Sequence, residues 1–263
     1  MPPISTLGRT REIMLHIILI IILASLSATA QGQVMPIYDS PKRADYIEAG
    51  KALQEIEFLE RVADSVNASV RLPTKVPLRL QECGEVNASY SQTSRAITLC
   101  YELVEEIFSG AMKDFSNVPP EKRMEFASGA LMVVLFHEVG HGLLHTLQIP
   151  ILGKEEDAAD SIANHIILHT RNPYPSIVGS AWFLTRGTRQ PGVRDYADAH
   201  SLNPQRAFNM LCYAVGMDAA KFRSLAERVG LTEDRALRCP DEYRQLERST
   251  RLLLRGHLTA NAP

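Results

Sequence analysis

The segment FASGALMVVLFHEVGHGLL, residues 126–144, contains the motif His137-Glu138-Val139-Gly140-His141 within an almost continuous apolar run. Such a run predicts a helix that is buried on nearly every side. Residues four positions apart share one helix face, so both imidazoles can reach one metal ion while Glu138 stands beside them. The segment therefore predicts a metal centre built on a core helix.

The motif alone also occurs by chance in unrelated chains. The competing interpretation is therefore two core histidines with hydrogen-bond partners beside a buried glutamate. Placing two histidines and a glutamate in an apolar core without partners costs free energy, and a bound divalent cation removes that cost. We therefore interpret His137 and His141 as metal ligands. Glu138 is the expected general base for metal-activated water, in a zinc-assisted hydrolysis that most often cleaves a peptide bond.

A catalytic zinc ion usually has three protein ligands and one open position. A third histidine six residues after the second would indicate a metzincin, but that position is Leu147, which excludes the class. His145 follows His141 on the same helix. Three ligands in a row on one straight helix cannot surround a tetrahedral ion, so we interpret His145 as a pocket or core histidine.

The third ligand is expected on a second helix, which follows a short loop at residues 148–153. Glu156 and Asp160 are four residues apart and share one face of this helix. We assign Glu156 as the ligand and Asp160 as the acceptor of an imidazole N–H, a bond that fixes the tautomer of the ligating ring. Glu155 remains the alternative ligand, because helix phase cannot be set to one residue from sequence. Acidic residues also occur in first helical turns simply because the helix dipole favours them.

Together, H-E-x-x-H and E-x-x-x-D resemble the gluzincin arrangement of thermolysin-like peptidases, with a shorter interval between His141 and Glu156 than in thermolysin itself. More closely, the chain resembles a family of secreted bacterial metallopeptidases known mainly as a domain of unknown function. The resembling segments span most of the chain and are residues 97–103, 135–141, 153–160, 200–202 and 238–243. This resemblance implies a zincin-like fold with a zinc site, for which we expect one ion, and it implies no substrate.

Hydrolysis through a tetrahedral oxyanion needs a second electrophile beside the metal. His200 is our first choice for this catalytic role, with Asp198 as its orienting partner. A solvated loop histidine is an equal interpretation, and Tyr196 and Arg206 are open alternatives.

The first 30 residues have the pattern of a secretory signal peptide. Arginines precede an apolar run at residues 13–26, and Ala28-Thr29-Ala30 offers a cleavage site. The run is shorter than the roughly 20 residues of a spanning helix, which leaves an uncleaved anchor as the lesser alternative. We expect a secreted or periplasmic protein whose residues 31–263 form a single domain without a stable membrane span.

Four cysteines follow the cleavage site, and an even number in an exported chain predicts two disulfide bonds. Three pairings are possible. We favour the most local one, which joins Cys83 to Cys100 and Cys212 to Cys239. The first bond would then cross a hairpin between two strands.

The remaining pattern predicts an α+β fold that is mostly helical, with a small N-terminal antiparallel sheet and a helical C-terminal part. In chain order we expect an irregular leader (31–43), an amphipathic helix (44–65), an edge strand (71–83), a polar turn region (84–94), a second strand (96–100) and a helix (102–115). Later helices are expected to begin at Asn203, Asp218 and Asp241. Residues 97–100 are either a substrate-binding edge strand or a buried hairpin strand.

The formal net charge of −2 is spread along the chain, which indicates no nucleic-acid partner and no cationic membrane helix. Three function classes remain, and the first is a zinc-dependent exported metallopeptidase acting on a peptide or protein. The second is a non-catalytic zinc-containing binding or regulatory protein. The third is a non-peptidase zinc amidase acting on cell-envelope material. The sequence leaves the substrate and the oligomeric state open.

Overall fold

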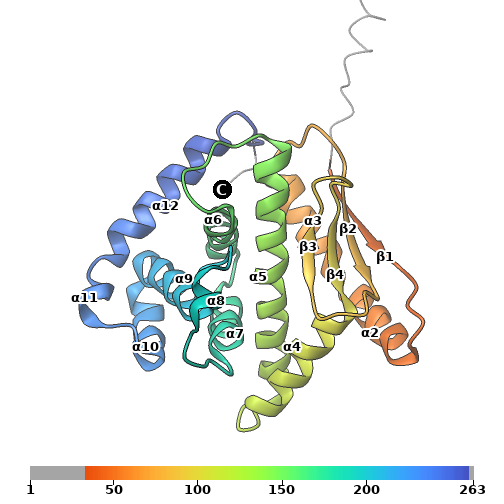
Figure 1. The fold of residues 1–263 in the computed structure, drawn as a ribbon, viewed down its shortest axis with the longest axis horizontal. Helices are drawn as coiled ribbons and strands as arrows, with labels where there is room; N and C mark the ends of the chain where they lie inside the picture. The colour runs from red at the N-terminus through yellow and green to blue at the C-terminus, as the bar shows by residue number, and fades with distance from the viewer. Residues whose placement is uncertain (1–32, 261–263) are drawn as a thin grey trace, which may run out of the picture.

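A long central helix, α5 (Pro120–Thr146), separates the two parts of the molecule (Figure 1). The computed structural model describes residues 33–260, so the expected signal peptide at residues 1–30 lies outside the described residues. The sheet and helices α2 and α3 lie on one side of α5, and the C-terminal helices lie on the other. The predicted α+β architecture, mostly helical with a small N-terminal sheet, is confirmed.

Within the described residues, four strands form a mixed sheet in the order β1-β2-β4-β3. Strands β1 (Val34–Tyr38), β2 (Val76–Gln81) and β4 (Ile97–Cys100) run parallel to one another. Strand β3 (Ala88–Tyr90) pairs antiparallel with β4. The expected antiparallel sheet is therefore wrong for most of its strands, because two helices between β1 and β2 supply the crossover that parallel strands need.

Several N-terminal boundaries also differ from the expectation. The leader contains β1, and the polar turn region contains β3. The expected single helix is two helices, α2 (Ala44–Glu55) and α3 (Phe58–Ser69), which are separated at Glu57, where φ is 54°. Strand β2 lies inside the sheet and is not an edge, and β4 is paired on both sides. The sheet edge next to α5 is therefore β3.

Helices α5 and α6 pack closely enough to exclude a side chain between them. A Cβ atom on Gly140 of α5 would lie 2.8 Å from the carbonyl oxygen of Ala159 in α6. A Cβ on Gly179 of α7 would lie 1.9 Å from the carbonyl oxygen of Phe126 in α5. Glycine at these positions lets the backbones approach and fixes the distance from α5 to the helices beside it.

Helix α5 lies in the core of the protein, where Leu131, Leu135 and Phe136 are fully buried. The other helices are α4 (Tyr101–Asp114), α6 (Glu155–Leu168), α7 (Tyr174–Thr185), α8 (Val193–Tyr196), α9 (Asn203–Met217), α10 (Ala219–Val229), α11 (Glu233–Ala236) and α12 (Cys239–Leu254). Among the described residues, α5 alone has the length and composition of a membrane span, and 72% of the window concerned is buried inside the protein.

Residues 33–260 contain two disulfide bonds, in the pairing that the sequence favours: Cys83–Cys100 and Cys212–Cys239. The first joins the chain just beyond β2 to the end of β4, where parallel strands end at the same edge, and not across a hairpin. The second joins α9 to α12. Two disulfides fit an extracellular or periplasmic protein.

Candidate metal centre

Side chains from α5 and α6 meet at one point. The Nε2 atoms of His137 and His141 are 3.2 Å apart, and an oxygen of Glu156 lies 3.1 Å from the first and 3.2 Å from the second. Donor atoms with this spacing can all lie about 2.1 Å from one ion, which is the length of Zn–N and Zn–O bonds. The donor set of two imidazoles and a carboxylate therefore fits a divalent transition metal.

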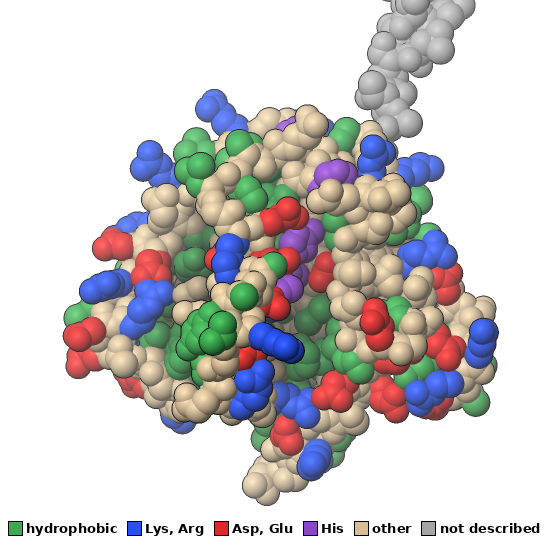
Figure 2. Space-filling model, in the orientation of Figure 1, with side chains coloured by type: hydrophobic (Ala, Val, Ile, Leu, Met, Phe, Trp, Pro, Cys, Tyr) green, Lys and Arg blue, Asp and Glu red, His purple; other side chains and the backbone are tan. Residues whose placement is uncertain are grey.

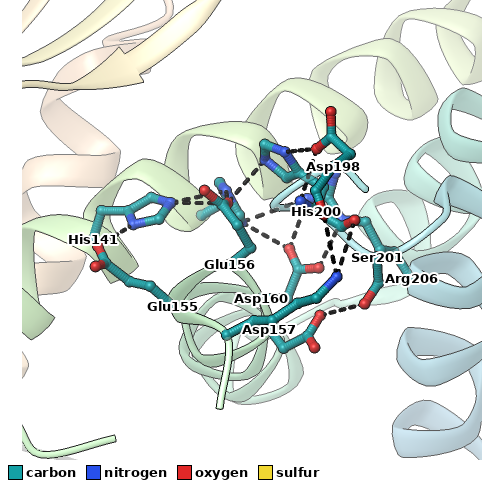
Figure 3. Close-up of polar contacts among 11 residues, drawn as sticks. His141, Glu155, Glu156, Asp157, Asp160, Asp198, His200, Ser201 and Arg206 are labelled. Carbon is teal, nitrogen blue, oxygen red and sulfur yellow. Dashed lines mark hydrogen bonds and ion pairs between the residues drawn. The ribbon is translucent and has the colours of Figure 1, made fainter. Parts of the chain in front are cut away.

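The outer nitrogen of each imidazole is held by a carboxylate. Asp160 Oδ1 lies 2.7 Å from His137 Nδ1, and Glu155 Oε1 lies 2.8 Å from His141 Nδ1 (Figure 3). With Nδ1–H donating to these acceptors, both rings turn Nε2 toward Glu156. This is the orientation that ligating histidines adopt when a neighbouring carboxylate fixes their tautomer.

The electrostatics of this cluster favour a positive charge. Burial lowers the pKa of His137, but hydrogen bonds with Asp160 and Glu156 outweigh burial and raise it to about 9. The hydrogen bond from His137 lowers the pKa of Glu156 to about 2. Carboxylates that favour a proton on an imidazole will equally favour a metal cation between the same groups.

Asp160 is itself held by a cation from α9. Burial raises the pKa of Asp160, but Arg206 and His137 outweigh it and hold this pKa well below the usual range. Arg206 binds both oxygens of Asp160, with Nε at 2.7 Å and Nη2 at 2.8 Å. Arg206 therefore orients Asp160. The sequence had left a different role open for Arg206, which was to bind the oxyanion.

Glu138 points into a cleft of about 580 Å³ that the metal centre shares with β3. Its side chain is buried, and burial raises its pKa, although the charges of His137 and His141 oppose this shift. The backbone N–H of Tyr90 in β3 faces Glu138 and slightly opposes this rise in pKa. Figure 2 shows histidine and acidic side chains gathered in a hollow at the middle of the face drawn there.

The open edge of β3 faces this cleft. Cys100 N–H donates to Asn87 O and Ser91 N–H donates to Ala96 O, which places the ladder bonds at alternate residues of β3. The backbone groups of Ala88 and Tyr90, both cleft residues, therefore point away from β4. The edge formed by Ala88 and Tyr90 is available for a further strand.

His200 contacts the same oxygen of Glu156 as His137 and His141 do. Its Nε2 is 2.8 Å from a Glu156 oxygen, and its Nδ1 is 3.2 Å from Asp198 Oδ1. Lys154 Nζ donates to the carbonyl oxygens of both His200 and Asp198, which holds their loop against the start of α6. The structure thus brings His200 and Asp198 to the site, while the expected alternative Tyr196 is 66% exposed and does not line the cleft.

A family model described as "Putative metallopeptidase" matches residues 38–254. The chain belongs to this family. The match includes every residue of the metal centre described above, and the family description agrees with a metal site beside a buried glutamate. Searches of curated proteins and of solved structures returned no match.

Among the contacts of this metallopeptidase-family site that were not expected from sequence, three involve His141, Asp160 and Glu138. They are the bond of Glu155 to His141, the bidentate bond of Arg206 to Asp160, and the Tyr90 backbone contact with Glu138. The first had a local signal, since adjacent acids open α6. The other two join elements far apart in the chain, and no spacing pattern reveals them. His145, expected to be a pocket or core residue, is partly buried and hydrogen-bonds the Tyr90 hydroxyl at 2.8 Å.

Proposed function

We propose that this protein is a zinc-dependent exported metallopeptidase with a gluzincin-type site in a zincin-like fold. The observation that carries the proposal is the convergence of His137 Nε2, His141 Nε2 and a Glu156 oxygen within 3.2 Å of one another. Two histidines and one glutamate with an open fourth position are the ligands of catalytic zinc in several peptidases. The signal-peptide pattern and the two disulfides support export.

The chain's own residues supply proton transfer. When bound, zinc acts as a Lewis acid that polarises the scissile carbonyl and lowers the pKa of water. Glu138 takes a proton from the attacking water and delivers it to the leaving amine. Its raised pKa suits this role, because a base with a higher pKa accepts a proton more readily near neutral pH.

His200 and β3 are assigned to substrate binding. With substrate bound, His200 turns its Nε2–H from Glu156 to the developing oxyanion, and Asp198 holds its other nitrogen. An extended peptide pairs with the open backbone groups of Ala88 and Tyr90 by strand addition. Residues 97–100 were open as either the substrate edge or a buried strand, and the first interpretation is wrong because that strand is paired on both sides.

The decisive experiment replaces Glu138 by glutamine. The E138Q variant is expected to retain stoichiometric metal and to hydrolyse an unfolded protein substrate about 10³-fold more slowly. Glu121→Gln is the matched control, because Glu121 is an exposed residue of the same helix. Unchanged hydrolysis by E138Q would contradict the mechanism. Peptidoglycan assayed in parallel separates a peptidase from an amidase of the cell envelope.

One observation favours a second candidate function. His137, Glu156 and His200 each place a potential ligand atom within 4.8 Å of the others, so His200 can also serve as a fourth ligand. A closed four-ligand site is typical of structural zinc, and the protein would then bind or regulate without turnover. His200→Ala distinguishes the two. As oxyanion donor, its loss lowers kcat about 100-fold or more and leaves metal affinity intact. As a ligand, its loss weakens metal binding instead.

A further inference from the structure

A second group of metal-ligating side chains lies further along α6. His165 lies in the last turn of α6, His169 is the residue that caps the end of this helix, and Glu247 comes from α12. His165 Nδ1 is 2.8 Å from one oxygen of Glu247, and His169 Nε2 is 3.5 Å from the other. The three ligand atoms lie within 4.8 Å of one another. We propose that His165, His169 and Glu247 form a second site for a divalent cation of the zinc class.

The tautomer of His169 supports a cation at this point. His169 Nδ1 lies 2.8 Å from the carbonyl oxygen of His165, and because a carbonyl can only accept, Nδ1 carries the proton. In the neutral ring, Nε2 then turns a lone pair toward the Glu247 carboxylate. These two electron-rich groups repel each other across this gap, and a metal ion bound by both removes the repulsion, as a proton on Nε2 would.

The surroundings leave access and room for an ion. His165 is buried, and the side chains of His169 and Glu247 are 21% and 18% exposed. A pocket of about 300 Å³ reaches both histidines, which provides an entry path and space for a fourth ligand such as water. Arg251 approaches Glu247 to 3.6 Å, but its side chain is 53% exposed and can turn toward solvent when a cation binds.

The consequence is a cross-link between two helices. Helix α6 carries Glu155, Glu156 and Asp160, the acids that contact the two imidazoles of the candidate metal centre. An ion held by His165, His169 and Glu247 would fasten this helix to α12, the last helix of the described chain. The second site is therefore structural: it braces α6 and does not take part in hydrolysis.

The test is the zinc stoichiometry of the metal-free protein, titrated with Zn²⁺ in competition with a chromophoric chelator. The wild-type chain is expected to bind two ions. A His137→Asn/His141→Asn variant, which lacks the first centre, is expected to bind one. Adding His169→Asn to that variant should weaken the remaining ion more than about 100-fold, because a ligand contributes more than the 10–100-fold typical of outer contacts. Adding His257→Asn is the matched control, since both hydrogen bonds described for His257 use its backbone.

A second variant keeps the test decisive if H169N does not fold. Glu247→Gln preserves the shape and the hydrogen bond from His165 but removes the charge, and it should lower wild-type stoichiometry from two ions to one. A folded His137/His141 variant that binds no zinc would overturn the proposal and leave a simple ion pair between α6 and α12. Zinc binding that is indifferent to both H169N and E247Q would also overturn it. Neither result depends on whether the protein is a peptidase.

Discussion

Glu155 and Glu156, adjacent at the start of α6, contact opposite nitrogens of one imidazole. An oxygen of Glu155 lies 2.8 Å from His141 Nδ1, and an oxygen of Glu156 lies 3.2 Å from His141 Nε2 (Figure 3). The side chain of Glu155 is 43% exposed, whereas that of Glu156 is 19% exposed. The two acids are therefore placed differently, and under the proposed function Glu156 binds the metal while Glu155 orients His141.

This difference predicts unequal effects of the same substitution. Glu156→Gln removes a ligand charge and should weaken zinc binding more than about 100-fold. Glu155→Gln keeps an acceptor for His141 Nδ1–H and should weaken zinc binding about 10-fold. Zinc competition titrations of the two variants measure the ratio. The reverse order of affinities would identify Glu155 as the ligand.

The sequence predicted the two histidines and their neighbouring helix but left these two glutamates unresolved. His137 and His141 share one helix, so their relative position follows from helix geometry alone. The choice between residues 155 and 156 depends on how α6 is rotated against α5. That rotation is set by tertiary contact, in which Gly140 meets the Ala159 backbone, and no local pattern encodes it.

The Gly140 contact can be tested directly. A methyl group at this position would lie 2.8 Å from Ala159 O, so Gly140→Ala must push α6 away from α5. We expect the free energy of unfolding to fall by about 1–3 kcal/mol. Zinc affinity should fall at least about 10-fold, because ligand atoms must stay within about 0.2 Å of their bond lengths.

Gly142→Ala is the matched control on the same helix. Its Cβ would lie 3.5 Å from the nearest Tyr90 ring atom, which is an ordinary contact. Alanine also favours a helix interior over glycine by about 1 kcal/mol. This variant should keep wild-type zinc affinity and stability or gain stability. Equal zinc affinity in the two variants would show that the α5–α6 spacing does not set the site.

Arg206 is expected to stabilise the metal-free protein through Asp160. Both side chains are mostly buried, at 17% and 19% exposed, and Arg206→Met leaves the Asp160 charge without its bidentate partner. Loss of one member of a buried pair should lower the free energy of unfolding by about 3 kcal/mol. Urea unfolding in the presence of a chelator measures this value. Arg206→Lys keeps the charge and should cost less, and a fully stable R206M would show that Asp160 needs no cation.

The sheet shows the other limit of sequence interpretation. Alternation and prolines located β2 and β4, but strand direction depends on what connects the strands. The segment before α2 looked irregular because of its prolines, although Pro36 lies at the sheet edge, in β1, where a missing N–H is tolerated. Because the sequence did not predict β1, the helices α2 and α3 could not be recognised as a crossover between two strands. A parallel arrangement could then not be predicted.

The disulfide at Cys83 and Cys100 encloses β3, so its removal should affect substrate binding as well as stability. Closing a loop with 17 residues of separation contributes about 3 kcal/mol to the free energy of unfolding in the chain-entropy model. In Cys83→Ala/Cys100→Ala, β3 is held mainly by its short ladder with β4. If β3 binds the substrate backbone, KM should rise while zinc affinity stays unchanged.

Removing the second disulfide separates these two effects. The Cys212–Cys239 bond spans 27 residues and joins α9 to α12, away from β3. Cys212→Ala/Cys239→Ala should lose about 3.5 kcal/mol of stability on the same reasoning, with KM unchanged. Urea unfolding and peptide kinetics at a temperature where both variants are folded provide the comparison. A rise in KM for both variants, or for neither, would argue against β3 as the substrate edge, because the only expected difference between them is the freedom of that strand.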